Sequence, residues 1–85
     1  PRAIIVADGL VLAAFLDGTL MLIDAASGDL LLASRVRIGG VATVLYALAA
    51  RGGRLAVGAI DGRIALVDLA ALAGMRPTRG GIDLA

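Results

Sequence analysis

The sequence contains no lysine, glutamate, histidine, cysteine or tryptophan, so its charged side chains are arginines and aspartates alone. The residue types that most often act as general bases and nucleophiles are therefore missing. The absence of cysteine also excludes disulfides and thiolate sites. We expect a non-catalytic chain that has no catalytic, cofactor-binding or metal-binding residues and needs no cofactor.

Long uninterrupted hydrophobic runs are also missing, although apolar residues make up 60% of the chain. The longest uncharged run, residues 38–50, has 13 residues, whereas a membrane-spanning helix needs about 20. The eight arginines and seven aspartates are interspersed and leave a net charge of +1. This distribution forms no basic patch for a phosphate backbone. We therefore expect neither a membrane span nor a nucleic-acid partner.

One short stretch occurs twice, 44 residues apart: residues 17–24 read DGTLMLID and residues 61–68 read DGRIALVD. Asp-Gly between two apolar runs is a strong hairpin signal, because both central residues of a type I′ turn need positive φ. The closing aspartates are expected to accept backbone hydrogen bonds in the turns that follow. The residues with predicted structural turn roles are Asp17, Gly18, Asp24, Gly28, Asp61, Gly62 and Asp68.

Turn signals divide the chain into short apolar segments of strand length. The predicted strands cover residues 3–7, 10–16, 19–24, 30–38, 41–50, 55–60 and 63–68. Residues 69–73 have a helix-forming composition and are expected to make one short turn that ends at Gly74. Pro77 and the glycine pair at 80–81 weaken a fourth strand in the second copy, which at best occupies a few residues near Ile82.

The apolar segments of the repeat do not alternate with polar residues. Residues 20–23 and 64–67 are apolar throughout, and strands of this kind are covered on both faces. The connections are too short for the crossover helices of a βαβ fold, and a hairpin unit with a period in the forties is typical of propeller blades. The predicted fold is all-β, with two four-stranded antiparallel meander blades of a β-propeller at residues 1–40 and 41–85.

Residues 6–31 resemble a repeat of the quinoprotein (pyrroloquinoline-quinone-like) β-propellers. Those repeats run strand, Asp-Gly, strand, Asp-Ala-x-[Thr/Ser]-Gly, strand, and residues 24–28 read DAASG. The second copy, residues 54–68, is equally similar to a WD-repeat blade. The resemblance therefore implies propeller blades and leaves the subfamily open.

The tryptophans typical of both repeats are absent. Quinoprotein-like repeats usually place one in the outermost strand, where residues 31–33 are Leu-Leu-Ala. WD repeats carry Gly-His before the blade and end the third strand in Trp-Asp, where this chain has Gly-Gly at 39–40 and no tryptophan at 23 or 67. Two alternatives follow: a divergent propeller, or blades held together by aliphatic packing alone.

About two blades make an incomplete ring, because propellers have typically four to eight. The chain begins with Pro1 rather than Met, and we expect it to associate with other blades of a longer protein or with itself. The resemblance and the missing residue types favour a scaffold that is structural or binds another protein. The alternatives are part of a quinoprotein-like propeller enzyme whose active site lies outside this segment, and an aliphatic membrane-associated fragment.

Few side chains are candidates for binding. Arg35 and Arg37 lie two apart and share one face of a predicted strand, so they are candidate contacts for an acidic partner, together with Arg76 and Arg79. A solvated edge that discourages further strand pairing is the alternative role. Three neighbouring residues carry side-chain oxygens that calcium could bind: Asp24, Ser27 and Asp29. Their spacing fits no established calcium loop, so a structural turn is the favoured role.

Overall fold

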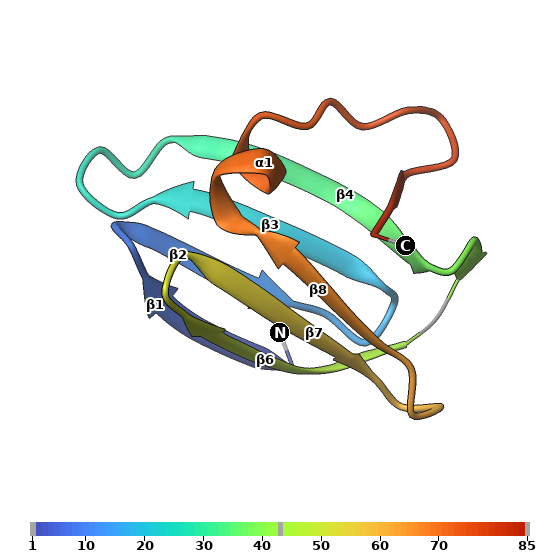
Figure 1. The fold of residues 1–85 in the computed structure, drawn as a ribbon. Helices are drawn as coiled ribbons and strands as arrows, with labels where there is room; N and C mark the ends of the chain where they lie inside the picture. The colour runs from blue at the N-terminus through green and yellow to red at the C-terminus, as the bar shows by residue number, and fades with distance from the viewer. Residues whose placement is uncertain (1, 43, 85) are drawn as a thin grey trace.

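The computed structural model describes residues 2–42 and 44–84, which form two mainly antiparallel sheets (Figure 1). The first sheet has the order β1 (Ala3–Ala7), β2 (Leu10–Ala14), β3 (Thr19–Asp24), β4 (Leu30–Ile38) and β5 (Val41–Ala42). The second has the order β6 (Leu45–Arg51), β7 (Arg54–Ala59) and β8 (Ile64–Asp68). The predicted predominance of antiparallel β-structure is confirmed. These residues form no closed barrel, and no helix among them is long and apolar enough to cross a bilayer.

The predicted strand over residues 41–50 is divided between the two sheets. β5 pairs with β4, whereas β6 begins at Leu45 and pairs with β7; residue 43, within the predicted strand, lies outside the described residues. Gly39 and Gly40 have φ values of 63° and 78°, and a type I′ turn needs positive φ at both central positions. The chain therefore reverses along β4 before it crosses to the second sheet.

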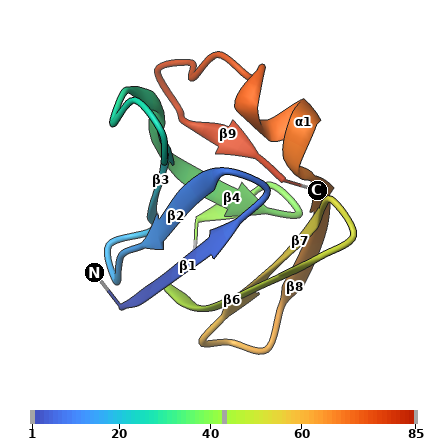
Figure 2. The same cartoon turned by 90° about the vertical axis from the view of Figure 1, so that its left-hand side faces the viewer.

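The last strand, β9 (Ile82–Asp83), pairs in parallel with β4 of the first sheet (Figure 2). The second sheet consequently has three strands in the described part of the chain. Gly81 permits the close approach, because its φ is 88° and an added Cβ would overlap the carbonyl oxygen of Arg35. The residues expected to supply a fourth strand to the second copy thus extend the first sheet instead.

The units β1–β2–β3 and β6–β7–β8 are built in the same way. All five residue pairs between β1 and β2, and all five between β2 and β3, recur in the second unit with 44 added to both residue numbers. For example, Ile5 opposite Leu12 recurs as Ala49 opposite Ala56. The two units therefore share one strand register.

Because residues directly opposite each other lie on the same side of a sheet, each unit has two faces that we name A and B. The A faces contain Ile5, Leu12 and Leu22 in the first unit and the equivalent Ala49, Ala56 and Leu66 in the second. The B faces contain Ile4, Ala13 and Met21 in the first unit and the equivalent Leu48, Val57 and Ala65 in the second. The hydrophobic core lies between the A face of the first sheet and the B face of the second. The two sheets are therefore stacked in the same sense.

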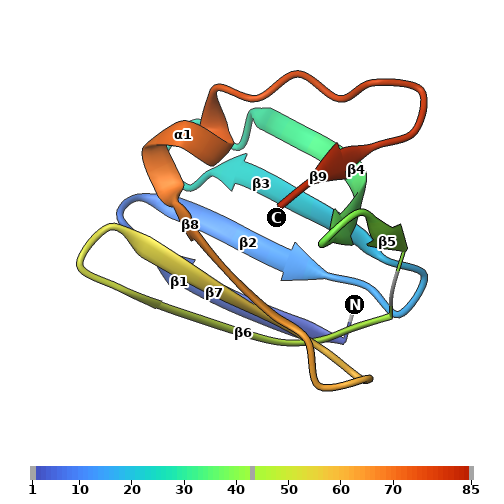
Figure 3. The same ribbon diagram turned by 45° about the vertical axis from the view of Figure 1, so that its right-hand side comes forward.

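The sheets approach each other along their first strands, where β1 lies against β6 (Figures 1 and 3). Helix α1 (Leu69–Ala73) covers the opening between β8 and the first sheet (Figure 3) and ends at Gly74, as predicted. Its residues Leu69 and Leu72 are buried in the core that both sheets share, as is Leu84 after β9. One hydrophobic core thus spans the described chain.

Candidate functional site

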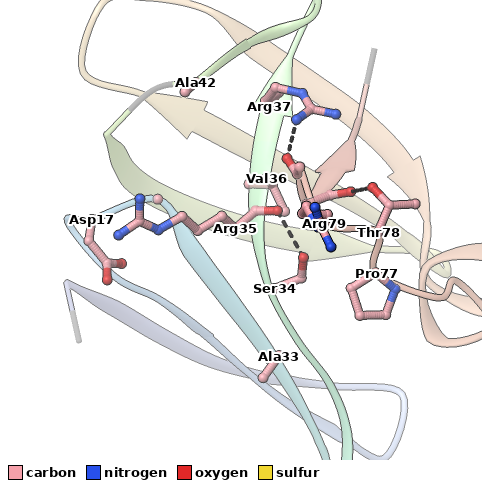
Figure 4. Close-up of a pocket in the computed structure, with 13 residues that line it drawn as sticks. Asp17, Ala33, Ser34, Arg35, Val36, Arg37, Ala42, Pro77, Thr78 and Arg79 are labelled. Carbon is pink, nitrogen blue, oxygen red and sulfur yellow. Dashed lines mark hydrogen bonds between the residues drawn. The ribbon is translucent and has the colours of Figure 1, made fainter.

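A groove of about 480 Å³ lies beside β4, between the β2–β3 loop and the segment that precedes β9 (Figure 4). Both predicted partner-contact residues, Arg35 and Arg37, line it, together with Arg79 and Asp17. Arg35 and Arg79 are 44 residues apart, at equivalent positions of the two copies. Because β9 pairs with β4, these two arginines meet at one groove.

Arg37 is part of the wall of the groove. Its guanidinium Nη1 donates a hydrogen bond to the carbonyl oxygen of Gly80 (Figure 4), and the Leu84 N–H donates to the Arg37 carbonyl at 2.7 Å. A Cβ at Gly80 would lie 2.7 Å from the same Nη1, so a larger residue there would displace the end of the Arg37 side chain. Arg37 therefore holds the C-terminal segment against β4.

Arg35 extends toward Asp17 on one side of the groove (Figure 4). The Thr19 N–H donates to Asp17 Oδ1 at 2.9 Å, and this bond is the main cause that lowers the pKa of Asp17 below its ordinary value of 3.8. The positive charge of Arg35 lowers that pKa further, to a smaller extent. Arg79 is exposed and has no hydrogen bond or ion pair with the residues that the structure describes. The groove consequently presents more positive than negative charge to solvent.

The repeated Asp-Gly pairs form two equivalent loops. The aspartates, Asp17 and Asp61, accept hydrogen bonds from the N–H group two residues further on, at 2.9 and 3.1 Å. The glycines, Gly18 and Gly62, have φ values of 91° and 90°, whereas neither aspartate has a positive φ. The expected type I′ turns are therefore not formed. The Phe15 N–H donates to the Thr19 carbonyl and the Ala59 N–H to the Arg63 carbonyl, both at 2.9 Å. These bonds enclose three-residue loops, 16–18 and 60–62, which need positive φ only at their glycines.

The closing aspartates of the two copies, Asp24 and Asp68, make different contacts. Asp24 Oδ1 accepts hydrogen bonds from the N–H groups two and three residues on, at 2.9 and 3.1 Å, in a turn where Gly28 has a φ of 78°. These bonds, the one from Ser27 first, lower the pKa of Asp24. Asp68 forms an exposed ion pair with Arg54 at 3.5 Å, and its carboxylate accepts no capping hydrogen bond from α1. Asp24 thus stabilises a local backbone turn, whereas Asp68 contributes a surface ion pair.

The groove has the chemistry of a binding surface. Guanidinium groups hold carboxylates through paired N–H donors in a planar fork. The hydroxyls in its wall are engaged, since Ser34 Oγ donates to the Arg35 carbonyl at 3.0 Å and Thr78 Oγ1 to the Gly81 carbonyl at 2.8 Å. In residues 2–42 and 44–84 no cluster of acidic side chains could hold a metal ion.

No protein-family model matches the chain, and no curated protein matches it. The fold and the groove therefore carry the functional argument. The sequence indicated Arg35, Arg37 and Arg79 as candidates but not that they line one groove. The predicted fold assigned Arg79 and the strand near Ile82 to the second blade, whereas this strand pairs with β4 of the first sheet. The one available signal was the identity of Arg35 and Arg79 at the 44-residue offset.

Proposed function

We propose that the chain is a β-propeller segment of about two blades that serves as a non-catalytic scaffold, structural or for binding another protein. The observation that carries the proposal is the same-sense stacking of two units with one register. Propeller blades are sheets repeated radially around a channel, so equivalent faces of neighbouring blades point the same way. The contact between β1 and β6, and the opening that α1 fills on the far side, support a radial arrangement.

The scaffold role is supported by what the side chains do. The aspartates of the repeated stretch accept backbone hydrogen bonds or form surface ion pairs, and the chain has no histidine, cysteine, lysine or glutamate to share a reaction with them. Other blades, or copies of the chain, are the first partners that we propose. The second is an acidic protein segment whose carboxylates contact Arg35 and Arg79 in the groove.

Tandem fusions test the propeller arrangement. The 85 residues and a three-residue linker make 88, which is twice the 44-residue period, so the junction keeps the spacing of the repeat. Fusions of two, three and four chains would contain four, six and eight blades. We expect one of these fusions to be a compact monomer in sedimentation velocity and to unfold in one transition at a higher urea midpoint than the single chain, because ring closure covers its terminal faces.

The matched control is the same set of fusions with a four-residue linker of the same Gly-Ser composition, which shifts each junction by one residue. If closure depends on the repeat, the gain in urea midpoint is smaller with the longer linker in the closing fusion. The propeller arrangement would be contradicted if the fusions of two, three and four chains all unfold at the urea midpoint of the single chain.

A further inference from the structure

Each sheet buries one apolar face and leaves the other uncovered. The B face of the first sheet, which the second sheet does not cover, has a central set made of Ile4, Val6, Val11, Ala13, Met21 and Ile23, of which Ala13 is buried. Arg35 on β4 lies at the edge of the same face. The uncovered A face of the second sheet has a central set made of Ala47, Ala49, Ala56, Gly58, Ile64 and Leu66, and Arg51, Arg54 and Asp68 lie at one end of it. These central sets contain no charged residue, and Val6 and Leu66 are 71% and 61% exposed. Large continuous apolar patches on a protein surface mark sites of association.

We propose that these two faces bind each other between copies of this chain, head to tail. The A face of the second sheet of one molecule docks on the B face of the first sheet of the next. The proposal deepens the proposed scaffold function and rests on its premise that the two units are equivalent. It does not require the assembly to close into a ring.

The template for this contact is the interface inside the chain. There an A face packs on a B face, and the proposed contact brings together the same two kinds of face. Leu66 is the equivalent of Leu22, which is fully buried in the core, and Val6 is the equivalent of Ala50, which packs against the same core. Docking would give Leu66 and Val6 the environments that their equivalents already have.

The residue sizes on the two uncovered faces differ from those at the equivalent positions of the internal interface. On β7, the second-sheet A face has Ala56 where the first sheet has the buried Leu12. On β3, the first-sheet B face has Met21 and Ile23, which are larger than their equivalents in the second sheet, Ala65 and Val67. On β2, by contrast, Val11 and Ala13 are smaller than their equivalents Leu55 and Val57. The proposed contact therefore repeats the kinds of face of the internal interface with a different packing of side chains.

An A-on-B contact is heterologous, since the two molecules contribute different surfaces. Such contacts generate rings when the rotation closes and open filaments when it does not, whereas a two-fold dimer uses the same patch twice. This difference makes the proposal testable with two single variants, each of which disables one face.

The experiment uses Val6→Asp and Leu66→Asp, measured by sedimentation velocity over a range of concentrations. Each places a carboxylate in an apolar contact, and burying an unpaired charge is costly. We expect the wild-type chain to self-associate and each variant alone to associate at least about tenfold more weakly. An equimolar mixture should form a one-to-one dimer and nothing larger, because the intact A face of Val6→Asp meets the intact B face of Leu66→Asp.

The control is Leu16→Asp, which introduces the same charge at a 54% exposed leucine in the β2–β3 loop, away from both faces. It should associate like the wild type, and circular dichroism should show β-structure in all three variants. A monomeric wild type, a single-face variant that associates as strongly as the wild type, or a mixture that associates no more strongly than the separate variants would each overturn the interface. If the two variants form a dimer when mixed and the wild type grows into open filaments, the interface is supported. The filaments would then count against a closed propeller.

Discussion

At the scale of single residues, the aspartates of the repeated stretch explain why two dissimilar apolar segments fold alike. Asp17 and Asp61 each accept the N–H group two residues on, which is the local bond that favours Asp in turns. The following glycine supplies the positive φ at no steric cost. This pair of residues fixes the loop and hence the register of the strands on either side.

We expect the stability of the chain to fall in acid in a way that depends on Asp17 and Asp24. Hydrogen bonds from backbone N–H groups, and for Asp17 also the charge of Arg35, lower the pKa of both carboxyls in the folded state. A lowered folded-state pKa stabilises the protein above the unfolded pKa of about 4, and this contribution is lost as pH falls through the folded pKa.

Urea midpoints measured at several pH values between about 7 and 2 test this expectation. The double variant Asp17→Asn, Asp24→Asn should be less stable than the wild type at neutral pH, and the two should converge below the folded-state pKa values. Two profiles that stay parallel down to the lowest pH would contradict the assignment, because the difference would then not depend on ionisation.

At the scale of elements, sequence patterns predicted most strands because glycines and aspartates mark their ends. The predicted spans 3–7, 19–24 and 30–38 coincide with β1, β3 and β4. The strand before the Asp17 loop ends earlier than predicted, at Ala14, because a three-residue loop with its flanking bonds replaces a two-residue turn. Local patterns fixed neither the break in the 41–50 segment nor the partner of β9, since both depend on contacts between distant residues.

The groove, too, could be predicted from local patterns only in part. The sequence indicated that Arg35 and Arg37 share a face of one strand, which is a local property of β-structure. The meeting of Arg35 with Arg79 depends on the pairing of β9 with β4. That pairing spans more than forty residues and has no local signal.

Helix α1 illustrates how a short element contributes through burial. A helix of five residues has little stability of its own, but Leu72 is fully buried between the sheets. We expect Leu72→Ala to lower the free energy of unfolding by about 2–5 kcal/mol, since it leaves a cavity in the shared core. Urea unfolding by circular dichroism measures this loss.

Leu16→Ala removes the same atoms from an exposed leucine and is the matched control, with an expected effect within about 0.5 kcal/mol. Equal effects of the two substitutions would mean that α1 does not help to close the core. A loss of the larger size would identify α1 as the element that fills the opening where the second sheet has no fourth strand.

At the scale of the whole molecule, charged side chains lie at the margins of the apolar sheet faces. The uncovered A and B faces are uncharged at their centres, whereas Arg35, Arg37 and Arg79 gather around the groove beside β4. Association through the sheet faces and binding in the groove therefore depend on different forces, although Arg35 lies at the edge of the first-sheet B face. Salt weakens interactions between exposed charges and leaves apolar contacts largely intact, so the two processes can be measured apart.

We expect a fluorescent hexaglutamate peptide to bind the chain at low ionic strength through the groove and to be released by added salt. Arg35→Gln and Arg79→Gln should each weaken binding about two- to fivefold, because exposed ion pairs contribute up to about 1 kcal/mol. Arg51→Gln makes the same change of charge on β6, outside the groove, and should have the smaller effect. Fluorescence anisotropy at several salt concentrations distinguishes the outcomes: equal effects of all three variants would mean that the peptide senses net charge alone, and the groove would then not be the partner contact.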